Sequence, residues 1–366
     1  MKFHPFFAML VCTILAGRVM GADVPGPETV AAPTVSAAIP TPLTKGQVIP
    51  LWPEGVPGWK DIGPETVSGT TYTNISNPRL IVYPPPAGTP SSGTAIIFCP
   101  GGGYIHVNIG GGIQGLFNPH GVTVFVLLYR CQEFGAPAPQ QDVLRAVRLV
   151  RAHAAEFGLD PTHIGVLGDS AGSHVAACAG TLFADPLGKT GAPLDQVSAR
   201  PDFMILLFSV LTMEDPNASA SSRRALLGPR PTPEQMAKYS VEQQVTADTP
   251  PAFLVHTQGD TTVKLENELQ LYAALRKHNV PTELHLYPVG THGSGLDPNF
   301  GPTALWPRLC EEWMRFNGWI PPSPASLMKV QTAAEATPRV GRAARGAAPA
   351  PPAAAAPAAN SATPGK

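Results

Sequence analysis

Six short apolar runs alternate along this chain with segments of helical periodicity. Most of the runs hold four to eight residues and lack the alternation of a half-exposed strand, which is typical of strands buried on both faces of a parallel sheet. Strands and helices alternating in this way predict an α/β fold, with a doubly wound, mostly parallel sheet and helices on both faces. The predicted strands are 94–99, 122–128, 164–167, 203–210, 253–256 and 283–287, and the predicted helices are 140–157, 171–182, 265–277 and 304–316.

Proline is abundant near both ends of the chain. Eight prolines fall in 22–58 and nine in 319–366, where proline alternates with alanine. A segment with so few large apolar side chains cannot bury enough surface to offset the entropy of ordering it. We therefore expect a linker at 22–58, one domain at 59–320 and a disordered tail at 321–366, and a chain cut at Ile320 should keep its function. Five Lys and Arg against one Glu leave tethering of the tail to a polyanion as an alternative.

The N-terminus has the three-part form of a secretory signal. A basic start precedes an apolar run at 6–17, and small residues allow cleavage near Gly21. A signal peptide at 1–21 predicts a secreted or periplasmic bacterial protein, with no stable membrane span once the signal is removed. Arg18 within this stretch leaves an uncleaved anchor as the alternative.

Charge and cysteine content argue against several classes of protein. The formal net charge of -1 gives no global field that would attract nucleic acid. No histidine and cysteine cluster has ligand spacing, so we expect no metal and no other cofactor. An even number of cysteines outside the signal permits disulfides, but their apolar surroundings favour buried free thiols. These are Cys99, Cys131, Cys178 and Cys310.

The pentapeptide Gly168-Asp169-Ser170-Ala171-Gly172 lies between a predicted strand and a predicted helix. G-x-S-x-G in that setting is typical of the nucleophile elbow, a sharp turn that exposes a serine hydroxyl at the amino end of a helix. Small residues flank the serine because the strand and the helix pass closely. Ser170 is therefore the predicted nucleophile, and a plain glycine-flanked turn is the alternative.

A second glycine motif could stabilise the oxyanion of a tetrahedral intermediate, which needs aimed hydrogen-bond donors. The N–H of Ala171 is one predicted donor, because this residue follows the nucleophile. Gly102 and Gly103 are predicted to supply the other, since the glycines after the strand at 94–99 let backbone N–H groups approach a substrate. A phosphate-binding loop is the alternative, but its GK[ST] ending is absent.

A nucleophilic serine needs a base, and the base needs a carboxylate that holds its tautomer. In this type of sheet the chain order is serine, acid, histidine, each in a loop after a strand. Asp260 and His292 follow the strands at 253–256 and 283–287, so they are the predicted acid and base. Other candidates fit less well, because they lie on the elbow helix (His174), inside strands (His256 and His285), in polar loops (Asp215 and Asp248) or on the elbow itself (Asp169).

These motifs, in this order, resemble the α/β-hydrolase superfamily. More closely, they are similar to exported bacterial feruloyl and acetylxylan esterases, many of whose relatives are labelled xylanases. The resemblance runs from about Leu51 to Trp319, and its specific pieces are 99–104, 129–130, 168–174, 240–256 and 283–287. It implies a triad of Ser170, Asp260 and His292, with an oxyanion hole formed by the glycine loop and Ala171.

The sequence departs from that family pattern in three places, all expected at the mouth of the site and therefore relevant to the substrate. Ser294 stands where the family tends to have Phe, and glycines occupy 108–115 where a helix is expected. Candidates for the substrate pocket are Tyr104, His106, Asp169 and Val263. After the acid, the usual Val-Pro-x-Glu-Asn-Ser becomes Val263-Lys264-Leu265-Glu266-Asn267-Glu268.

We therefore expect a serine esterase that removes acetyl or feruloyl groups from polysaccharide or oligosaccharide, or that cleaves a small ester. A prolyl-oligopeptidase-like peptidase is one alternative, but it needs a propeller domain for which 22–58 is too short. A non-catalytic carbohydrate-binding protein on the same fold is another, although such proteins usually lose a triad residue. The polar segment 212–249 would make a poor apolar lid, which argues against a long-chain lipase.

Overall fold

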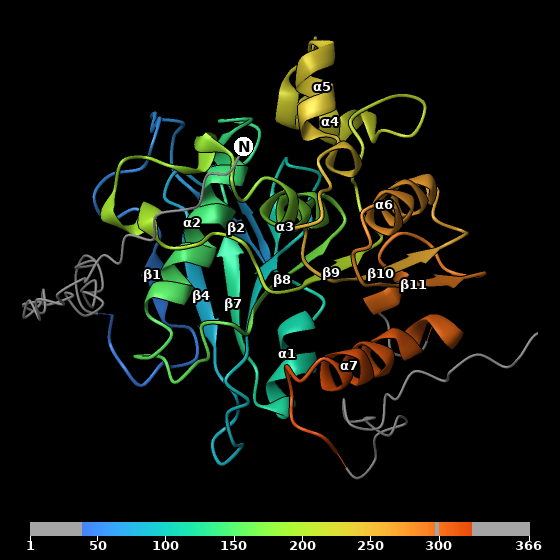
Figure 1. The fold of residues 1–366 in the computed structure, drawn as a ribbon. Helices are drawn as coiled ribbons and strands as arrows, with labels where there is room; N and C mark the ends of the chain where they lie inside the picture. Colours follow the sequence, from blue (N-terminus) through green and yellow to red (C-terminus); the bar gives the residue numbers. More distant parts are fainter. Residues whose placement is uncertain (1–38, 297–299, 324–366) are drawn as a thin grey trace, which may run out of the picture.

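The computed structural model describes residues 39–296 and 300–323. The predicted signal peptide, the first part of the predicted linker and nearly all of the predicted tail lie outside these ranges. The described chain forms an eight-stranded sheet in the order β1-β4-β7-β5-β8-β9-β10-β11 (Figure 1). The strands are β1 (Val48–Pro50), β4 (Arg79–Tyr83), β5 (Ala95–Cys99), β7 (Thr123–Leu128), β8 (Ile164–Asp169), β9 (Met204–Leu207), β10 (Ala252–Thr257) and β11 (Thr282–Tyr287).

Six of these strands run parallel, and each overlaps one of the six predicted apolar runs. β4 pairs antiparallel with β7, and β1 pairs antiparallel with β4. Strands β5, β7, β9 and β10 are buried along their whole length, which explains their unbroken apolar sequences. The predicted doubly wound, mostly parallel sheet is confirmed.

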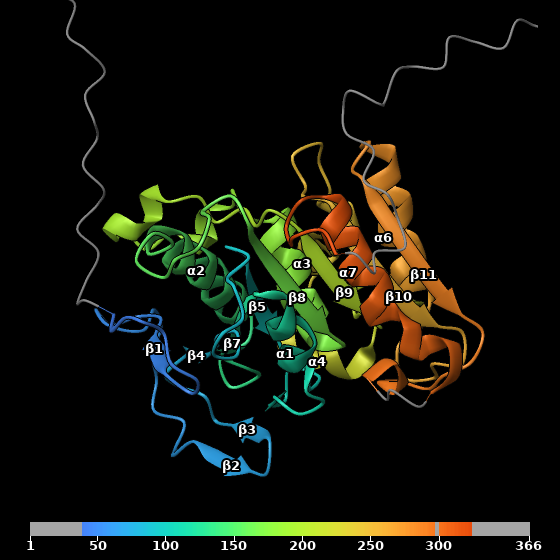
Figure 2. The same ribbon diagram turned by 90° about the horizontal axis from the view of Figure 1, so that it is seen from below.

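Helices cover both faces of this sheet (Figures 1 and 2). Alternate side chains of β5 point to opposite faces of the sheet and pack against different helices. Ile97 lies in the same core cluster as Val175 of α3. Ile96 and Phe98 lie in the other cluster, with Trp306 of α7. The first layer contains α2 (Ala138–Ala152), α3 (Ala171–Thr181) and α6 (Glu266–Lys277), and the second contains α1 (Ile113–Phe117) and α7 (Trp306–Phe316).

The folded region begins before the predicted boundary at residue 59. Strand β1 belongs to the main sheet, and Leu51 and Trp52 are buried in its core. Trp52 Nε1–H donates to Oδ1 of Asp142 at 2.9 Å, and the buried Arg130 guanidinium lies 2.8 Å from the same oxygen. The domain therefore starts before residue 59, because Ile49, Leu51 and Trp52 are part of its core.

Several short elements were not predicted, because runs of two to five residues give little periodicity. Two short helices lie within the polar segment 212–249, which also buries Met213, Leu226 and Val241 in the core. That segment therefore packs on the domain. Besides β1, β4 and α1, the unpredicted strands and α-helices are a small sheet of β2 (Thr66–Ser68), β3 (Thr71–Thr73) and β6 (Val107–Asn108), and the helices α4 (Ala220–Leu227) and α5 (Pro233–Tyr239).

All four cysteines of the described ranges are buried and none of them forms a disulfide, as their apolar surroundings predicted. Across residues 39–296 and 300–323, no helix combines the length and apolar character that crossing a membrane requires.

Candidate active site

The predicted site residues meet where the parallel strands end at their carboxyl edge. The glycine loop follows β5 and the elbow follows β8, while Asp260 follows β10 and His292 follows β11. In α/β sheets this edge is where ligands bind, because loops from several strands converge there. The fold thus places His292 beside residues that are 32 and 122 positions away in the chain.

Ser170 occupies a strained turn between β8 and α3. Its backbone has φ 54° and ψ −125°, a region that L residues with a side chain rarely adopt. A side chain at Gly168 would collide with the backbone of Gly172, and one at Gly172 would collide with the carbonyl oxygen of Cys99. The two glycines are therefore required for the strand and helix to approach closely enough to hold this serine.

A chain of hydrogen bonds joins Ser170, His292 and Asp260. Ser170 Oγ lies 2.8 Å from His292 Nε2, and His292 Nδ1 lies 2.7 Å from Asp260 Oδ2. The ring of Phe208 packs edge-on against the imidazole, with centroids 5.1 Å apart. Neutral His292 can therefore donate from Nδ1 to the carboxylate while Nε2 accepts from the serine hydroxyl.

The carboxylate of Asp260 is held by several donors. Its Oδ1 accepts from the backbone N–H groups of Thr262 at 2.8 Å and Val263 at 3.0 Å, while Oδ2 faces His292. Burial would raise the pKa of this carboxyl, but hydrogen bonds from His256 and His292 and from the backbone outweigh burial and hold the pKa well below its usual range. Asp260 is therefore ionised throughout the neutral pH range.

A second histidine lies behind Asp260. His256 is fully buried, with Nδ1 at 2.6 Å from Oε2 of Glu268 and Nε2 at 3.5 Å from Oδ2 of Asp260. Nε2 also lies 3.1 Å from the carbonyl oxygen of Val263. Burial alone would lower the pKa of His256, but its hydrogen bonds to the two carboxylates raise it to about 10. The imidazole is therefore a buried cation at neutral pH, flanked by two carboxylates.

Glu268 lies behind the proposed triad. The expectation that this departure from the family pattern lies at the mouth of the site is therefore wrong for Glu268. Its side chain is fully buried, and Oε1 accepts from the backbone N–H of Ser209 at 2.6 Å. Sequence reasoning missed the Glu268–His256 pair because it treated His256 as an ordinary strand residue. The available signals were the spacing of four residues between His256 and Asp260, and the acidic residue where the family has Ser.

Three backbone N–H groups of the glycine loop and the elbow lack a hydrogen-bond partner within the described ranges. Among the described residues, the N–H groups of Gly102, Gly103 and Ala171 donate to no protein acceptor. Gly101 N–H donates instead to Oδ1 of Asp169 at 2.9 Å, which ties the glycine loop to the elbow. The predicted donor set is therefore free to bind an oxyanion.

Tyr104, one of the predicted pocket residues, points into the core. It is fully buried, and its hydroxyl lies 2.6 Å from Nδ1 of His174. Burial lowers the pKa of His174 to about 4, so this ring is neutral; its Nε2–H donates to the carbonyl of Tyr239 at 2.6 Å. Nδ1 must therefore accept from the Tyr104 hydroxyl, and both residues are structural.

The other pocket candidates, His106, Asp169 and Val263, line a cavity of about 620 Å³ together with Ser170 and His292. Burial raises the pKa of Asp169 to about 6, against the opposing effect of the hydrogen bond from Gly101. In the described part of the chain, no group of three or more His, Cys, Asp or Glu side chains is arranged to hold a metal ion.

The BD-FAE family model matches residues 80–275, more than half of the chain. Two curated proteins also match: endo-1,4-beta-xylanase B of Butyrivibrio fibrisolvens, 34% identical over 54% of this chain, and an acetylxylan esterase of Xylanibacter ruminicola, 31% identical over 56%. The matched regions are 32% and 42% of those proteins, so this chain spans less than half the length of either.

Solved structures of similar fold include an acetyl ester-xyloside bifunctional hydrolase from Caldicellulosiruptor lactoaceticus. It is 36% identical with a TM-score of 0.68, and the match covers 77% of this chain and 100% of that one. The carboxylesterase Cest-2923 of Lactobacillus plantarum matches with a TM-score of 0.57 over 71% of this chain and 99% of its own; at 23% identity it supports the fold alone. The family model and the first of these structures together show that this chain belongs to the BD-FAE family, a group of carboxylic ester hydrolases with the α/β-hydrolase fold.

Proposed function

We propose that this protein is a serine esterase that removes acyl groups, acetyl or feruloyl, from plant-type polysaccharide or oligosaccharide. The observation that carries this proposal is the hydrogen-bonded chain from Ser170 through His292 to Asp260, beside three unpaired backbone N–H groups. Export of the protein is a further part of the proposal and rests on the sequence at 1–21.

In the first half of the reaction, His292 Nε2 removes the proton of Ser170 as Oγ attacks the ester carbonyl carbon. The carbonyl π electrons move to the oxygen, and the N–H groups of Gly102, Gly103 and Ala171 stabilise the resulting negative charge. Asp260 stabilises the imidazolium through Nδ1 and stays ionised. When the tetrahedral intermediate collapses, the bond to the alcohol oxygen breaks and His292 gives that oxygen its proton.

In the second half, water replaces the alcohol. His292 removes a proton from water as the oxygen attacks the acyl carbon, and the same donors bind the oxyanion. Collapse then breaks the bond to Ser170 Oγ, which regains its proton from His292. The products are a carboxylic acid and the deacylated alcohol, so the enzyme returns to its starting state without any cofactor.

Xylan-type esters are supported as the substrate class by the names of two relatives, an acetylxylan esterase and an acetyl ester-xyloside hydrolase. Cleavage of glycosidic bonds is less well supported. That reaction generally requires two carboxyl groups flanking the bond, and Asp169 is the only carboxylate among the described residues that line the cavity at Ser170.

A fluorophosphonate probe tests the serine chemistry. We expect the intact mass of the wild-type protein to increase by one covalently bound probe and that of Ser170→Ala to stay unchanged. An equal shift in both proteins, or none in the wild type, would contradict the proposal. Release of acid from acetylated xylan, feruloylated arabinoxylan and a short aryl ester then identifies the acyl group, with an aryl amide as the control for peptidase activity.

A further inference from the structure

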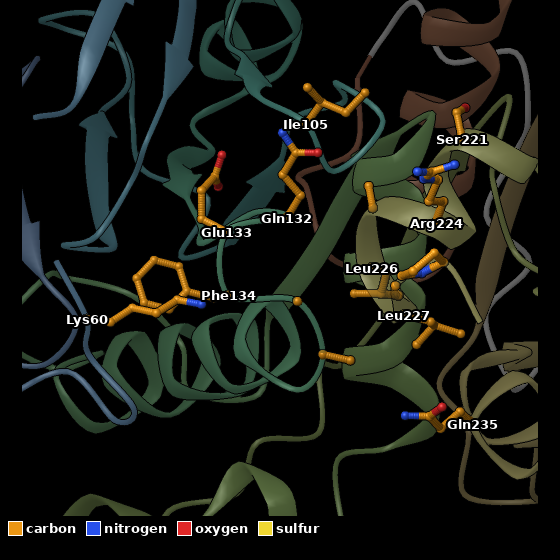
Figure 3. Close-up of a pocket in the computed structure, with 15 residues that line it drawn as sticks. Lys60, Ile105, Gln132, Glu133, Phe134, Ser221, Arg224, Leu226, Leu227 and Gln235 are labelled. Carbon is orange, nitrogen blue, oxygen red and sulfur yellow. The ribbon is translucent and has the colours of Figure 1, made fainter. Parts of the chain in front are cut away.

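A second cavity of about 730 Å³ lies next to the cavity at Ser170, and Figure 3 shows the residues that line this second cavity. The two cavities are contiguous, because Ile105 and Ser221 line both of them. One wall is the loop 132–136 after β7 and the other is formed by α4, with Lys60 at one end. We call this space the Arg224 cavity. Its volume lies within the roughly 300–1,000 Å³ typical of ligand sites.

The cavities continue beyond α4. A third depression of about 360 Å³ shares Arg224, Gly228 and Pro229 with the Arg224 cavity. The three spaces therefore follow one another from Ser170 along the surface, each joined to the next by common lining residues. An acetyl group needs only the first space, so the length of this series suits a ligand that extends away from the ester as a chain.

The lining of the Arg224 cavity suits hydroxyl groups, which both donate and accept hydrogen bonds. Lys60 and Arg224 are cationic donors, Glu133 offers a carboxylate, and Gln132 and Gln235 offer amides. Lys60 Nζ lies 5.2 Å from the centroid of the Phe134 ring, which orients it along the cavity wall.

Two of these groups lack a partner within the protein. Among the described residues, the exposed Arg224 guanidinium makes no hydrogen bond or ion pair, although Arg223 beside it pairs with Asp215 at 3.1 Å. Oε2 of Glu133 is buried and accepts no hydrogen bond from the described protein. A cation and a carboxylate on opposite walls can both hydrogen-bond to the hydroxyl groups of a polar chain that lies between them.

We propose that the Arg224 cavity binds the sugar chain that continues beyond the esterified sugar, with Arg224 and Glu133 hydrogen-bonding to its hydroxyl groups. This inference rests on the proposed function, because it assigns the alcohol side of the same ester. The enzyme should then prefer an acetylated oligosaccharide to an acetylated single sugar, since only the longer alcohol reaches past Ile105 and Ser221.

The test compares kcat/KM on acetylated xylotetraose, acetylated xylose and 4-nitrophenyl acetate. We expect Arg224→Ala to lower kcat/KM on the acetylated tetraose, relative to kcat/KM on the aryl ester, about tenfold. The change should lie mainly in KM for the tetraose, because a hydrogen bond to a charged group is lost. Arg308→Ala is the matched control, since Arg308 is an exposed arginine on α7, on the other face of the sheet. The ratio of the two kcat/KM values in Arg308→Ala should equal that of the wild type.

A second variant protects against a local folding defect. Glu133→Gln keeps the shape of the side chain and should also reduce the preference for tetraose over xylose. If the wild type prefers acetylated tetraose to acetylated xylose and both cavity variants keep that preference, the assignment of the cavity is wrong. The esterase proposal would then still stand. A wild type that cleaves the aryl ester but neither acetylated sugar would overturn the carbohydrate substrate itself, and the cavity proposal with it.

Discussion

Glu268 Oε2 lies 2.6 Å from Nδ1 of His256, and this fully buried pair stands directly behind Asp260. Asp260 Oδ2 therefore faces His292 at 2.7 Å on one side and His256 at 3.5 Å on the other. The acid of the proposed triad is thus placed between two imidazoles, one exposed to the cavity and one enclosed in the core.

Glu268→Gln should weaken both stability and catalysis. The amide can still accept from Ser209 N–H, but it removes the charge that helps to keep His256 protonated. Breaking a buried ion pair lowers the free energy of unfolding by about 3 kcal/mol or more. We expect kcat to fall about tenfold, because His256 then holds the Asp260 carboxylate in place less firmly. Thermal unfolding and ester turnover measure the two effects. Glu266→Gln, an exposed glutamate on the same helix, is the control.

The stability effect of Glu268→Gln should depend on pH. The pKa of His256 is raised in the folded state from the ordinary 6.5 to about 10, so its contribution is complete below about pH 6.5 and is lost as the pH rises towards 10. The difference in melting temperature between wild type and variant should therefore be largest near pH 6 and shrink by pH 10. A difference that stays constant over this range would mean that His256 does not titrate with Glu268.

Removal of the proposed base or acid should abolish most of the turnover. We expect His292→Ala to lower kcat roughly 10³-fold or more, and Asp260→Asn somewhat less, by analogy with serine proteases. The measurement is turnover of a short aryl ester by variants whose circular dichroism matches the wild type. Near-normal rates in a folded Asp260→Asn protein would assign the acid to another residue.

Asp169→Asn should stabilise the protein at neutral pH. Burial raises the pKa of Asp169 from 3.8 to about 6, so the folded state binds this proton more tightly than the unfolded state does. The wild type therefore loses stability as the pH rises from about 3.8 to about 6 and stays less stable above that, whereas an amide still accepts from Gly101 N–H and does not ionise. The expected gain above pH 6 is on the order of 2 kcal/mol.

Thermal unfolding at pH 4 and pH 7.5 checks this prediction. The gain from Asp169→Asn should be present at pH 7.5 and small at pH 4, where the carboxyl group is already protonated. Asp248→Asn, at an exposed carboxylate in a loop, provides the control. If Asp169→Asn changes the thermal stability equally at pH 4 and pH 7.5, the change comes from packing and not from ionisation.

Gly172→Ala should prevent correct assembly of the elbow. A methyl group there collides with backbone atoms of Cys99 and Pro100, which cannot move away as a flexible side chain could. We expect a loss of several kcal/mol, on the order of 3, and no probe labelling of Ser170. Gly115→Ala is the matched control, because Gly115 lies in α1 with open space around its Cα, and alanine should stabilise that helix by up to about 1 kcal/mol. A soluble, active Gly172→Ala protein would contradict the elbow geometry.

The parts of the fold that could be predicted are those with a local signal. The apolar runs of β5, β7 and β10 predicted buried strands because each is buried on both faces. Strands β1 and β4 gave no such signal: they are short, pair antiparallel near one edge of the sheet and are only partly buried. The folded region therefore starts earlier than proline content suggested.

The sequence by itself determined the parallel sheet, the turn that carries Ser170 and the order in which Asp260 and His292 follow their strands, because each depends on neighbouring residues. Only the tertiary structure decided that Tyr104 points into the core, that Glu268 and His256 form a buried pair, and that a cavity extends from Ile105 to Arg224. These features depend on the direction of side chains and on contacts between separate strands, helices and loops, and such contacts exist only once the sheet has brought those segments together.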